Sequence, residues 1–394
     1  MKKPDLIFPV LIALLFSLPV WSQNVKKLHY GAVVIDTHND ILTTVCTDST
    51  VHIDRDMTGK THSDIGRFAR GGLDVQIFSV WCDGNMKNPY SWANREIDSL
   101  YSISLRNWQH MEVAFSYQHL KKLIRKRKFA AMIGVEGGHM IEDDLDKLDD
   151  LYKRGARYMT LTWNNSTSWA TSAMDETLKK DSLPHKGLTG FGKKVVQRMN
   201  ELGMMVDLSH VGEQTFWDAI NTSTRPVIVS HSCSYTLCPV FRNLKDEQIR
   251  AVAKNNGVIC VNFFSGFVDS NFSKRNNEFN QRHKSERDSI VKTVSDPYFA
   301  DTYLFTKYKD EVEALRPPLS LLIDHIDYMV KLAGIDHVGL GSDFDGINSA
   351  PKELDDVTAY PKITKALLAR GYSKRDIKKI LGKNVLRVFR ANQQ

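Results

Sequence analysis

The feature of this chain that most limits its fold is a repeated pairing of a short apolar run with a polar side chain at the end of the run. Five such runs occur, and each leads to a residue of a type that binds metals or transfers protons. In a parallel α/β barrel, the active site lies at the carboxyl ends of the strands. If the runs are neighbouring strands, their terminal side chains converge: His38 and Asp40, Glu136, His210, His231, and Asp343.

Eight apolar runs of strand length are present, and segments of helical periodicity separate most of them. Eight strands alternating with helices is the count of a (β/α)8 barrel of the TIM type, and 394 residues do not force a division into two domains. A doubly wound open sheet has the same alternation, but it often carries a glycine-rich phosphate turn after its first strand, and this sequence has none. The predicted strands are 33–37, 74–81, 130–135, 157–162, 204–208, 226–230, 257–262 and 337–341.

The first residues have the pattern of a secretory signal peptide. Lys2 and Lys3 form a positively charged start, and Leu6 to Val20 is mostly apolar. This stretch is shorter than the roughly 20 residues that a membrane span needs, although an uncleaved anchor is the alternative. We therefore predict a signal peptide over 1–23, one metallo-hydrolase barrel domain over 24–394, and a periplasmic or secreted protein with no stable membrane anchor after cleavage.

The net charge of +7 is dispersed along the chain, apart from a basic run over 121–128. Leu120, Leu123 and Ile124 have helical spacing within and before this run, which favours a solvated helix face over a nucleic-acid site. We predict no nucleic-acid partner. The five cysteines are too few and too irregularly spaced for a disulfide scaffold.

Residues 265–318 interrupt the alternation with a polar and charged stretch before the last predicted strand. We predict an inserted helical segment that serves as a lid or as a dimer contact, because loops at this end of a barrel border the active site. A disordered loop is the alternative. The last segment, 363–390, predicts two helices joined at 371–373 that close the fold.

The polar side chains at the strand ends have the chemistry of a metal centre. His38 and Asp40 are two residues apart at a strand end, so both can point to the same side and reach one cation. Burial of Glu136 is costly unless that carboxylate is neutralised, paired or bound to metal. His210 and His231 each follow a serine at a strand end. Each alone would more often be structural, but their recurrence favours metal ligands.

Two ions that share Glu136 as a bridge would each have three protein ligands, with His38 and Asp40 on one ion and His210 and His231 on the other. Zinc suits this set of nitrogen and oxygen ligands, so we predict two Zn²⁺ per chain. Asp343 would accept the proton of the attacking water and pass it to the leaving nitrogen. Asp345, in the same motif, is the rival for this role; Asp343 is preferred because it terminates the strand.

With these residues in place, the chain resembles the membrane dipeptidase (renal dipeptidase) family of binuclear zinc metallopeptidases, which have amidohydrolase-like barrels. The matching stretches occur in the same order over nearly the whole chain after the signal segment: 35–40, 134–139, 157–162, 207–210, 230–232 and 341–346. The resemblance implies the metal roles above, Glu136 as the bridge and Asp343 as the acid-base group. It also implies a homodimer.

The resemblance adds two substrate-binding residues. It implies that Arg242 holds the free carboxylate of the substrate, and the forked guanidinium suits that task. It also places Trp163 where well-studied members have a histidine that contacts the substrate. Indole donates one hydrogen bond but cannot bind metal, so Trp163 either reshapes the pocket or packs, with Asn164 supplying polarity.

These observations predict a zinc-dependent dipeptidase that hydrolyses the amide bond of dipeptides, with L-D dipeptides among its substrates. One alternative is another binuclear amidohydrolase reaction on an acyl-amino acid, a lactam or an ester. The other alternative is a barrel that binds metal without catalysis.

Overall fold

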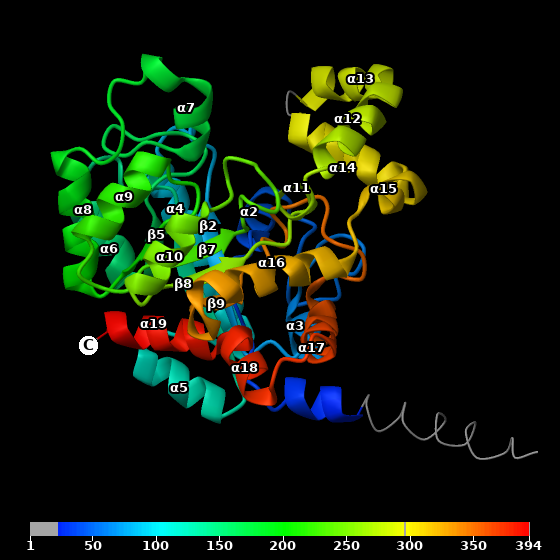
Figure 1. The fold of residues 1–394 in the computed structure, drawn as a ribbon, viewed down its shortest axis with the longest axis horizontal. Helices are drawn as coiled ribbons and strands as arrows, with labels where there is room; N and C mark the ends of the chain where they lie inside the picture. Colours follow the sequence, from blue (N-terminus) through cyan, green and yellow to red (C-terminus); the bar gives the residue numbers. More distant parts are fainter. Residues whose placement is uncertain (1–22, 295–296, 394) are drawn as a thin grey trace, which may run out of the picture.

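The chain folds into a closed barrel of eight parallel strands surrounded by helices, in a computed structural model that describes residues 23–294 and 297–393 (Figure 1). The strands follow one another in chain order around the barrel, and the pairing of β2 with β4 closes the ring. The predicted (β/α)8 architecture is confirmed. The barrel strands are β1 (Ile35–Asp36), β2 (Val75–Trp81), β4 (Phe129–Glu136), β5 (Ala156–Thr160), β6 (Met205–Asp207), β7 (Ile228–Ser232), β8 (Val258–Val261) and β9 (Val338–Leu340).

Each barrel strand coincides with one of the eight predicted runs, and one further short strand was not predicted. That strand, β3 (Met111–Val113), pairs with the first three residues of β4. The strand β5 pairs with β4 only from Ile133 onward, so β3 adds to the sheet without entering the ring. A run of three residues, one of them a glutamate, is too short to give a periodic signal.

Alternate residues of the strands pack inside the barrel or against the helical layer. The interior residues of β2 and β4 share one apolar cluster with the C-terminal helix α19 (Asn384–Asn392), which contributes Val385, Val388 and Phe389. The helices α5 (Tyr117–Arg125) and α19 thereby cover the amino-terminal end of the barrel (Figure 1). The opposite end is left for the site. The outer layer includes α4 (Pro89–Arg106), α6 (Leu145–Lys153), α8 (Gly190–Leu202), α9 (Glu213–Thr222), α10 (Asp246–Lys254) and α16 (Leu319–Ala333).

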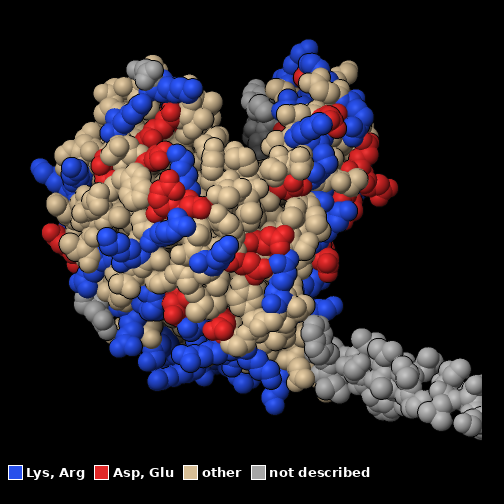
Figure 2. Space-filling view, in the orientation of Figure 1, with Lys and Arg blue, Asp and Glu red and all other residues tan. Residues whose placement is uncertain are grey.

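The polar stretch before the last strand is helical, not a disordered loop, over its described residues. It has its own apolar core, formed by Phe272, Phe279, Leu304, Phe305, Val312 and Leu315. It projects from the barrel, and a hollow separates part of it from the rest of the molecule (Figures 1 and 2). Its role as a lid or dimer contact stays a prediction. The helices are α11 (Ser265–Val268), α12 (Phe272–Arg282), α13 (Lys284–Val294), α14 (Pro297–Lys307) and α15 (Lys309–Leu315).

The C-terminal segment contains one more break than its periodicity predicts. The first helix, α17 (Tyr360–Ala369), ends before Gly371, but the second is divided into α18 (Lys374–Lys378), a turn of π type over Lys379–Lys383, and α19. The break lies at Gly382, which packs so closely on the start of β1 that a Cβ atom there would lie 2.6 Å from the carbonyl oxygen of Val33. Tertiary contact with the barrel therefore sets this break.

The predicted signal peptide lies outside the described residues, except for its last position. Residues 23–29 are helical and pack on the barrel through His29, whose Nδ1 lies 2.7 Å from Thr364 Oγ1. Within the described part of the chain, none of the helices combines the length and the apolar character of a membrane span.

A buried carboxyl group, Glu96 of α4, joins three elements beside the site end of the barrel. Thr43 Oγ1 of α2 (Ile41–Thr47) donates to one carboxyl oxygen at 2.8 Å, and the amide of Trp81 donates to the other at 2.7 Å. Burial raises the pKa of Glu96 to about 8, because desolvation outweighs these hydrogen bonds. Glu96 is therefore protonated at neutral pH.

We expect the Glu96→Gln substitution to make the protein less sensitive to pH. The folded-state pKa lies above the unfolded value, so the contribution of Glu96 to stability is fully present below pH 4.5 and is lost as pH rises to about 8. Ionisation of this one group changes the free energy of unfolding by at most about 1.4 kcal/mol per pH unit. Thermal melts of both proteins across this range measure it. Parallel curves for the variant and the native protein would contradict a raised pKa.

Candidate metal centre

The polar residues predicted from the strand ends meet at the carboxyl end of the barrel. Glu136 is the last residue of β4, His231 lies in β7, and His38 follows β1 by two residues. His210 and Asp343 follow β6 and β9, and both have a backbone φ of +64°. This left-handed conformation is uncommon for residues other than glycine and is concentrated at functional sites. It occurs here at two strand ends whose side chains turn into the same space.

Glu136 lies at the centre of this group and presents one carboxylate oxygen to each side. Its Oε1 lies 2.8 Å from His210 Nε2 and 3.4 Å from His231 Nε2. Its Oε2 lies 3.3 Å from His38 Nε2 and accepts a hydrogen bond of 3.2 Å from Ser79 Oγ. The carboxylate therefore divides the histidines into a pair on one oxygen and a single residue on the other.

The other side of the site is formed by His38, Asp40 and Asp343, whose ligand atoms lie within 4.8 Å of one another. His38 Nε2 is 3.4 Å from Asp40 Oδ2. The amide of Asn262 donates to Asp343 Oδ2 at 2.8 Å. Burial and the charge of Asp40 raise the pKa of Asp343 well above its usual range. A carboxyl group in this environment takes up a proton more readily than an exposed one.

Each of the three histidines is held by a hydrogen bond at Nδ1. Tyr158 OH lies 2.8 Å from His38 Nδ1 and donates its own proton to the carbonyl of Thr37, so it accepts from the histidine. Asn164 Oδ1 lies 3.1 Å from His210 Nδ1 and can only accept. In each case the Nδ1 atom carries a proton, so Nε2 is the atom that faces the centre of the site. Burial opposes a charge on His38, but the neighbouring Tyr158, Glu136 and Asp40 outweigh it and raise the pKa of His38 well above its usual range.

The third histidine is fixed in the same tautomer by a buried network. His231 Nδ1 lies 2.8 Å from Ser230 Oγ, and Ser230 Oγ donates to Asp207 Oδ2 at 2.6 Å. The serine proton is thus committed to the aspartate, and the serine accepts from His231. Outer hydrogen bonds of this kind orient the histidine ligands of protein metal sites.

The unprotonated Nε2 atoms face one another without a proton between them. His210 Nε2 and His231 Nε2 are 3.0 Å apart, and both face Glu136 Oε1. Burial lowers the pKa of His210 to about 4 and the pKa of His231 well below its usual range, so both are neutral. His38 Nε2 is buried and has no hydrogen-bond partner among the described residues. Converging lone pairs of this kind fit a bound cation, since without one they repel.

Asp345, the rival of Asp343, lies against a different part of the chain. It accepts hydrogen bonds from the amide of His62 at 2.6 Å, from Asn39 Nδ2 at 3.2 Å and from Ser63 Oγ. These contacts attach the 61–63 loop to the strand end. Of the two aspartates, Asp343 lies close to His38 and Asp40, and Asp345 does not belong to that group.

Arg242 is buried beside the cluster around Glu136 and does not lie on the surface. Its guanidinium donates to the carbonyl of His231 at 3.3 Å and to Ser232 Oγ at 3.4 Å, and it lies 5.3 Å from the ring centroid of Phe267. Burial lowers the pKa of Arg242 to about 10, which leaves it charged at neutral pH. Within the described part of the chain it forms no ion pair, so its charge is available to a ligand.

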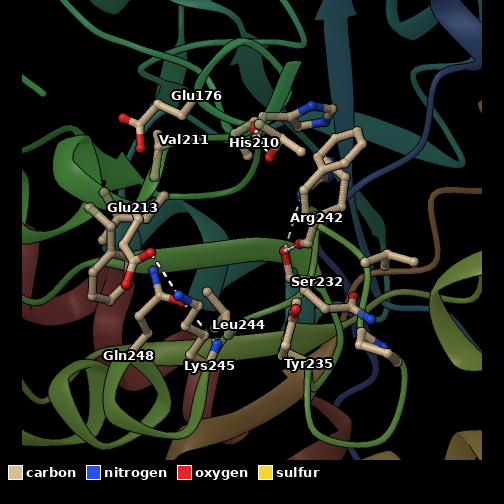
Figure 3. Close-up of a pocket in the computed structure, with 18 residues that line it drawn as sticks. Glu176, His210, Val211, Glu213, Ser232, Tyr235, Arg242, Leu244, Lys245 and Gln248 are labelled. Carbon is tan, nitrogen blue, oxygen red and sulfur yellow. Dashed lines mark hydrogen bonds and ion pairs between the residues drawn. The ribbon is translucent and has the colours of Figure 1, made fainter. Parts of the chain in front are cut away.

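Arg242 and His210 together line a cavity of about 530 Å³ (Figure 3). Figure 3 shows both residues on one side of this cavity, with Glu213 and Lys245 on the other. Glu213 and Lys245 form an ion pair of 2.7 Å at the exposed side. The volume falls in the range of small-molecule sites, and the cavity connects the charged guanidinium with the histidine cluster.

Comparison with known proteins identifies the family. The model of the membrane dipeptidase family (peptidase family M19) matches residues 22–394. The chain belongs to this family. As a membrane dipeptidase family member it is a metal-dependent hydrolase of peptide bonds, a metallo-dipeptidase.

Solved structures have the same fold as this metallo-dipeptidase over nearly its whole length. The probable dipeptidase PvdM from Pseudomonas aeruginosa is 23% identical with a TM-score of 0.75 and covers 95% of this chain and 99% of its own. Dipeptidase AC, a metallo peptidase, is 22% identical with a TM-score of 0.75 and coverages of 92% and 99%. A Rhodobacter sphaeroides metallo peptidase, liganded with a phosphinate mimic of L-Ala-D-Ala, is 20% identical with a TM-score of 0.75 and the same coverages.

Trp163 of this dipeptidase is half-buried at the edge of the site. Its ring lies 5.0 Å from the ring of Trp81 in an edge-to-face arrangement and 6.4 Å from the ring of His210. The two tryptophans form an aromatic wall beside the histidine pair. The next residue, Asn164, supplies the hydrogen bond to His210.

Sequence reasoning missed several residues that hold the site together, namely Tyr158, Ser230, Asp207 and Asn262. Tyr158 occupies the space in front of Gly134, where a Cβ atom would lie 2.0 Å from the tyrosine ring. The alternation of β5 could have indicated that Tyr158 points inward with Thr160, but not that it reaches His38. That contact joins residues 120 positions apart.

We expect Tyr158→Phe to weaken cation binding roughly 10- to 100-fold, because His38 would lose the acceptor that fixes its tautomer. Competition against a chelator, followed by metal analysis, measures this affinity. Tyr101→Phe is a matched control, since it removes a hydroxyl that bonds to the carbonyl of Arg154 away from the site. Equal affinities in both variants would exclude a role for Tyr158 in holding His38.

Proposed function

We propose that this metallo-dipeptidase holds two zinc ions per chain and hydrolyses dipeptides, including those with a D-residue at the carboxyl side. The observation that carries the proposal is the arrangement around Glu136. One of its oxygens faces the unprotonated Nε2 atoms of His210 and His231, at 2.8 and 3.4 Å, and the other faces His38 Nε2, at 3.3 Å. Two groups of ligand atoms, joined by the carboxylate of Glu136, suit two cations.

The charge of the site supports the number two, and the ligand types support zinc. Asp40, Glu136 and Asp343 carry three negative charges when ionised. His210 and His231 are neutral, and His38 must also be neutral at Nε2 when it binds a cation. One divalent cation would leave a negative site, and two would leave one positive charge, which suits an anionic transition state. Imidazole and carboxylate ligands without cysteine are typical of catalytic zinc.

Cations in such a site supply polarisation of the peptide carbonyl and a lower pKa for the attacking water. Asp343 accepts the proton of that water and returns it to the leaving amine. Its burial disfavours the ionised form, which suits the carboxyl group to take up the proton of the water. Asn262 holds the carboxyl group in place through the 2.8 Å hydrogen bond to Oδ2.

Arg242 binds the carboxylate at the end of the substrate. It is buried, charged and without an ion-pair partner among the described residues, and it lies against the carbonyl of His231. A substrate held at both Arg242 and the cations has a fixed length between its scissile bond and its free carboxylate. This requirement favours dipeptides over longer peptides.

The inclusion of L-D dipeptides rests on the relative from Rhodobacter sphaeroides, whose structure contains a phosphinate mimic of L-Ala-D-Ala. We also propose that the enzyme acts in the periplasm or outside the cell. The positively charged start and the apolar stretch from Leu6 to Val20 support export.

The proposal predicts two zinc ions per chain and chelator-sensitive hydrolysis of both L-L and L-D dipeptides. Metal analysis and product detection on the same preparation measure both. We expect Asp343→Asn to lower kcat roughly 10²- to 10⁴-fold, the range for a lost acid-base group, while zinc remains bound. Two ions without dipeptide turnover would point to another amidohydrolase substrate. One ion, or activity that survives in Asp343→Asn, would contradict the mechanism.

The role of Arg242 predicts a substrate-specific loss in the Arg242→Lys variant. We expect kcat/KM for a dipeptide to fall roughly 100-fold, as for a lost hydrogen bond between charged groups. For the same dipeptide with a carboxamide in place of its carboxylate, the variant and the native enzyme should have similar values. Arg250→Lys, on the exposed side of α10, is the matched control. A loss of equal size on both substrates would show that Arg242 does not recognise the substrate carboxylate.

A further inference from the structure

A groove rich in positive charge lies between α5 and α19, at the barrel end opposite the metal centre. Its volume is about 600 Å³, and none of the side chains that line it is acidic. Three neutral residues, Tyr117, Gln118 and Gln393, complete the lining. The basic side chains are all exposed: Lys121, Lys122, Arg125, Lys126 and Arg390.

The positive charges in this groove lack compensation. Among the described residues, none of the five basic side chains forms an ion pair, whereas the neighbouring Lys128 pairs with Glu112 at 2.6 Å. Lys121 Nζ and the guanidinium carbon of Arg390 lie 5.6 and 5.9 Å from the same ring centroid, that of Tyr117. Both positive charges therefore lie near one wall of the groove, and an anionic ligand there would meet both of them.

The positive region is broader than the groove. Figure 2 shows Lys and Arg side chains gathered along the lower edge of the molecule, below α5, α18 and α19. Lys374 and Arg375 of α18 are exposed, as are Lys26 and Lys27 at the start of the described chain. An extended set of basic residues suits an extended anionic surface better than a single small anion.

We propose that the α5–α19 groove and the surrounding basic side chains dock this dipeptidase on a bilayer that contains anionic phospholipids. The described chain begins at the same lower end of the molecule (Figure 1). Contact of the basic side chains with a bilayer would bring this end of the barrel to the lipid surface. The metal centre, at the other end, would then face the solution and its small substrates.

The test is co-sedimentation of the mature chain, residues 24–394, with vesicles of phosphatidylcholine alone and of phosphatidylcholine mixed with phosphatidylglycerol. Binding to neutral vesicles measures any contribution that does not depend on lipid charge. We expect stronger binding to the anionic vesicles, and we expect salt to remove the difference. We expect the triple variant Lys121→Gln, Lys122→Gln, Arg125→Gln to lower anionic binding roughly 100-fold, from about fivefold for each basic side chain.

A second triple variant with the same charge change controls for net charge: Lys193→Gln, Lys194→Gln, Lys254→Gln, on the exposed faces of α8 and α10. It should retain the preference for anionic vesicles, and both variants should keep the native dipeptidase activity. Equal binding of the native chain to both kinds of vesicle would overturn the proposal. An equal loss in the two variants would also overturn it, since net charge and not the groove would then be responsible.

Discussion

The structure of this dipeptidase depends on one buried carboxylate and on the groups that stabilise its charge. Glu136 is almost fully buried, and the Nε2 atoms of three histidines point at its two oxygens. Such a group is unfavourable unless positive charge is bound there. The barrel therefore holds these side chains in an arrangement that is unfavourable by itself and becomes favourable with cations. The metal dependence of the family follows from this arrangement.

The barrel maintains this arrangement through a surrounding set of hydrogen bonds. Tyr158, Asn164 and Ser230 each accept a hydrogen bond from Nδ1 of one histidine, so all three rings present the same nitrogen to the centre. Side chains with a single available orientation give a site its precision. The left-handed backbone at His210 and Asp343 adds to this, because it turns both side chains inward immediately after their strands.

The two ends of the barrel differ in charge and in chemistry. At the carboxyl end, three carboxylates are grouped with three histidines, and Arg242 is buried beside them without an ion-pair partner among the described residues. At the amino-terminal end, α19 fills the barrel with Val385, Val388 and Phe389 and exposes basic side chains beside those of α5. Loops at one end can therefore vary with the substrate, while the other end is free to interact with a surface. This separation is a general property of (β/α)8 barrels.

The sequence by itself determined the eight strands and the residues at their ends, because buried strands are apolar and a polar residue at the end of each is easily distinguished. It also indicated the 265–318 insertion, because this polar stretch interrupts the alternation of strands and helices. Only the tertiary structure decided which partner each side chain meets. Tyr158 and His38 are 120 positions apart, and Asn262 and Asp343 are 81 apart. The burial of Arg242 and the separate position of Asp345 likewise depend on which loops pack together. Local periodicity carries no information on such contacts, since they arise only when the barrel closes and brings distant strand ends to one surface.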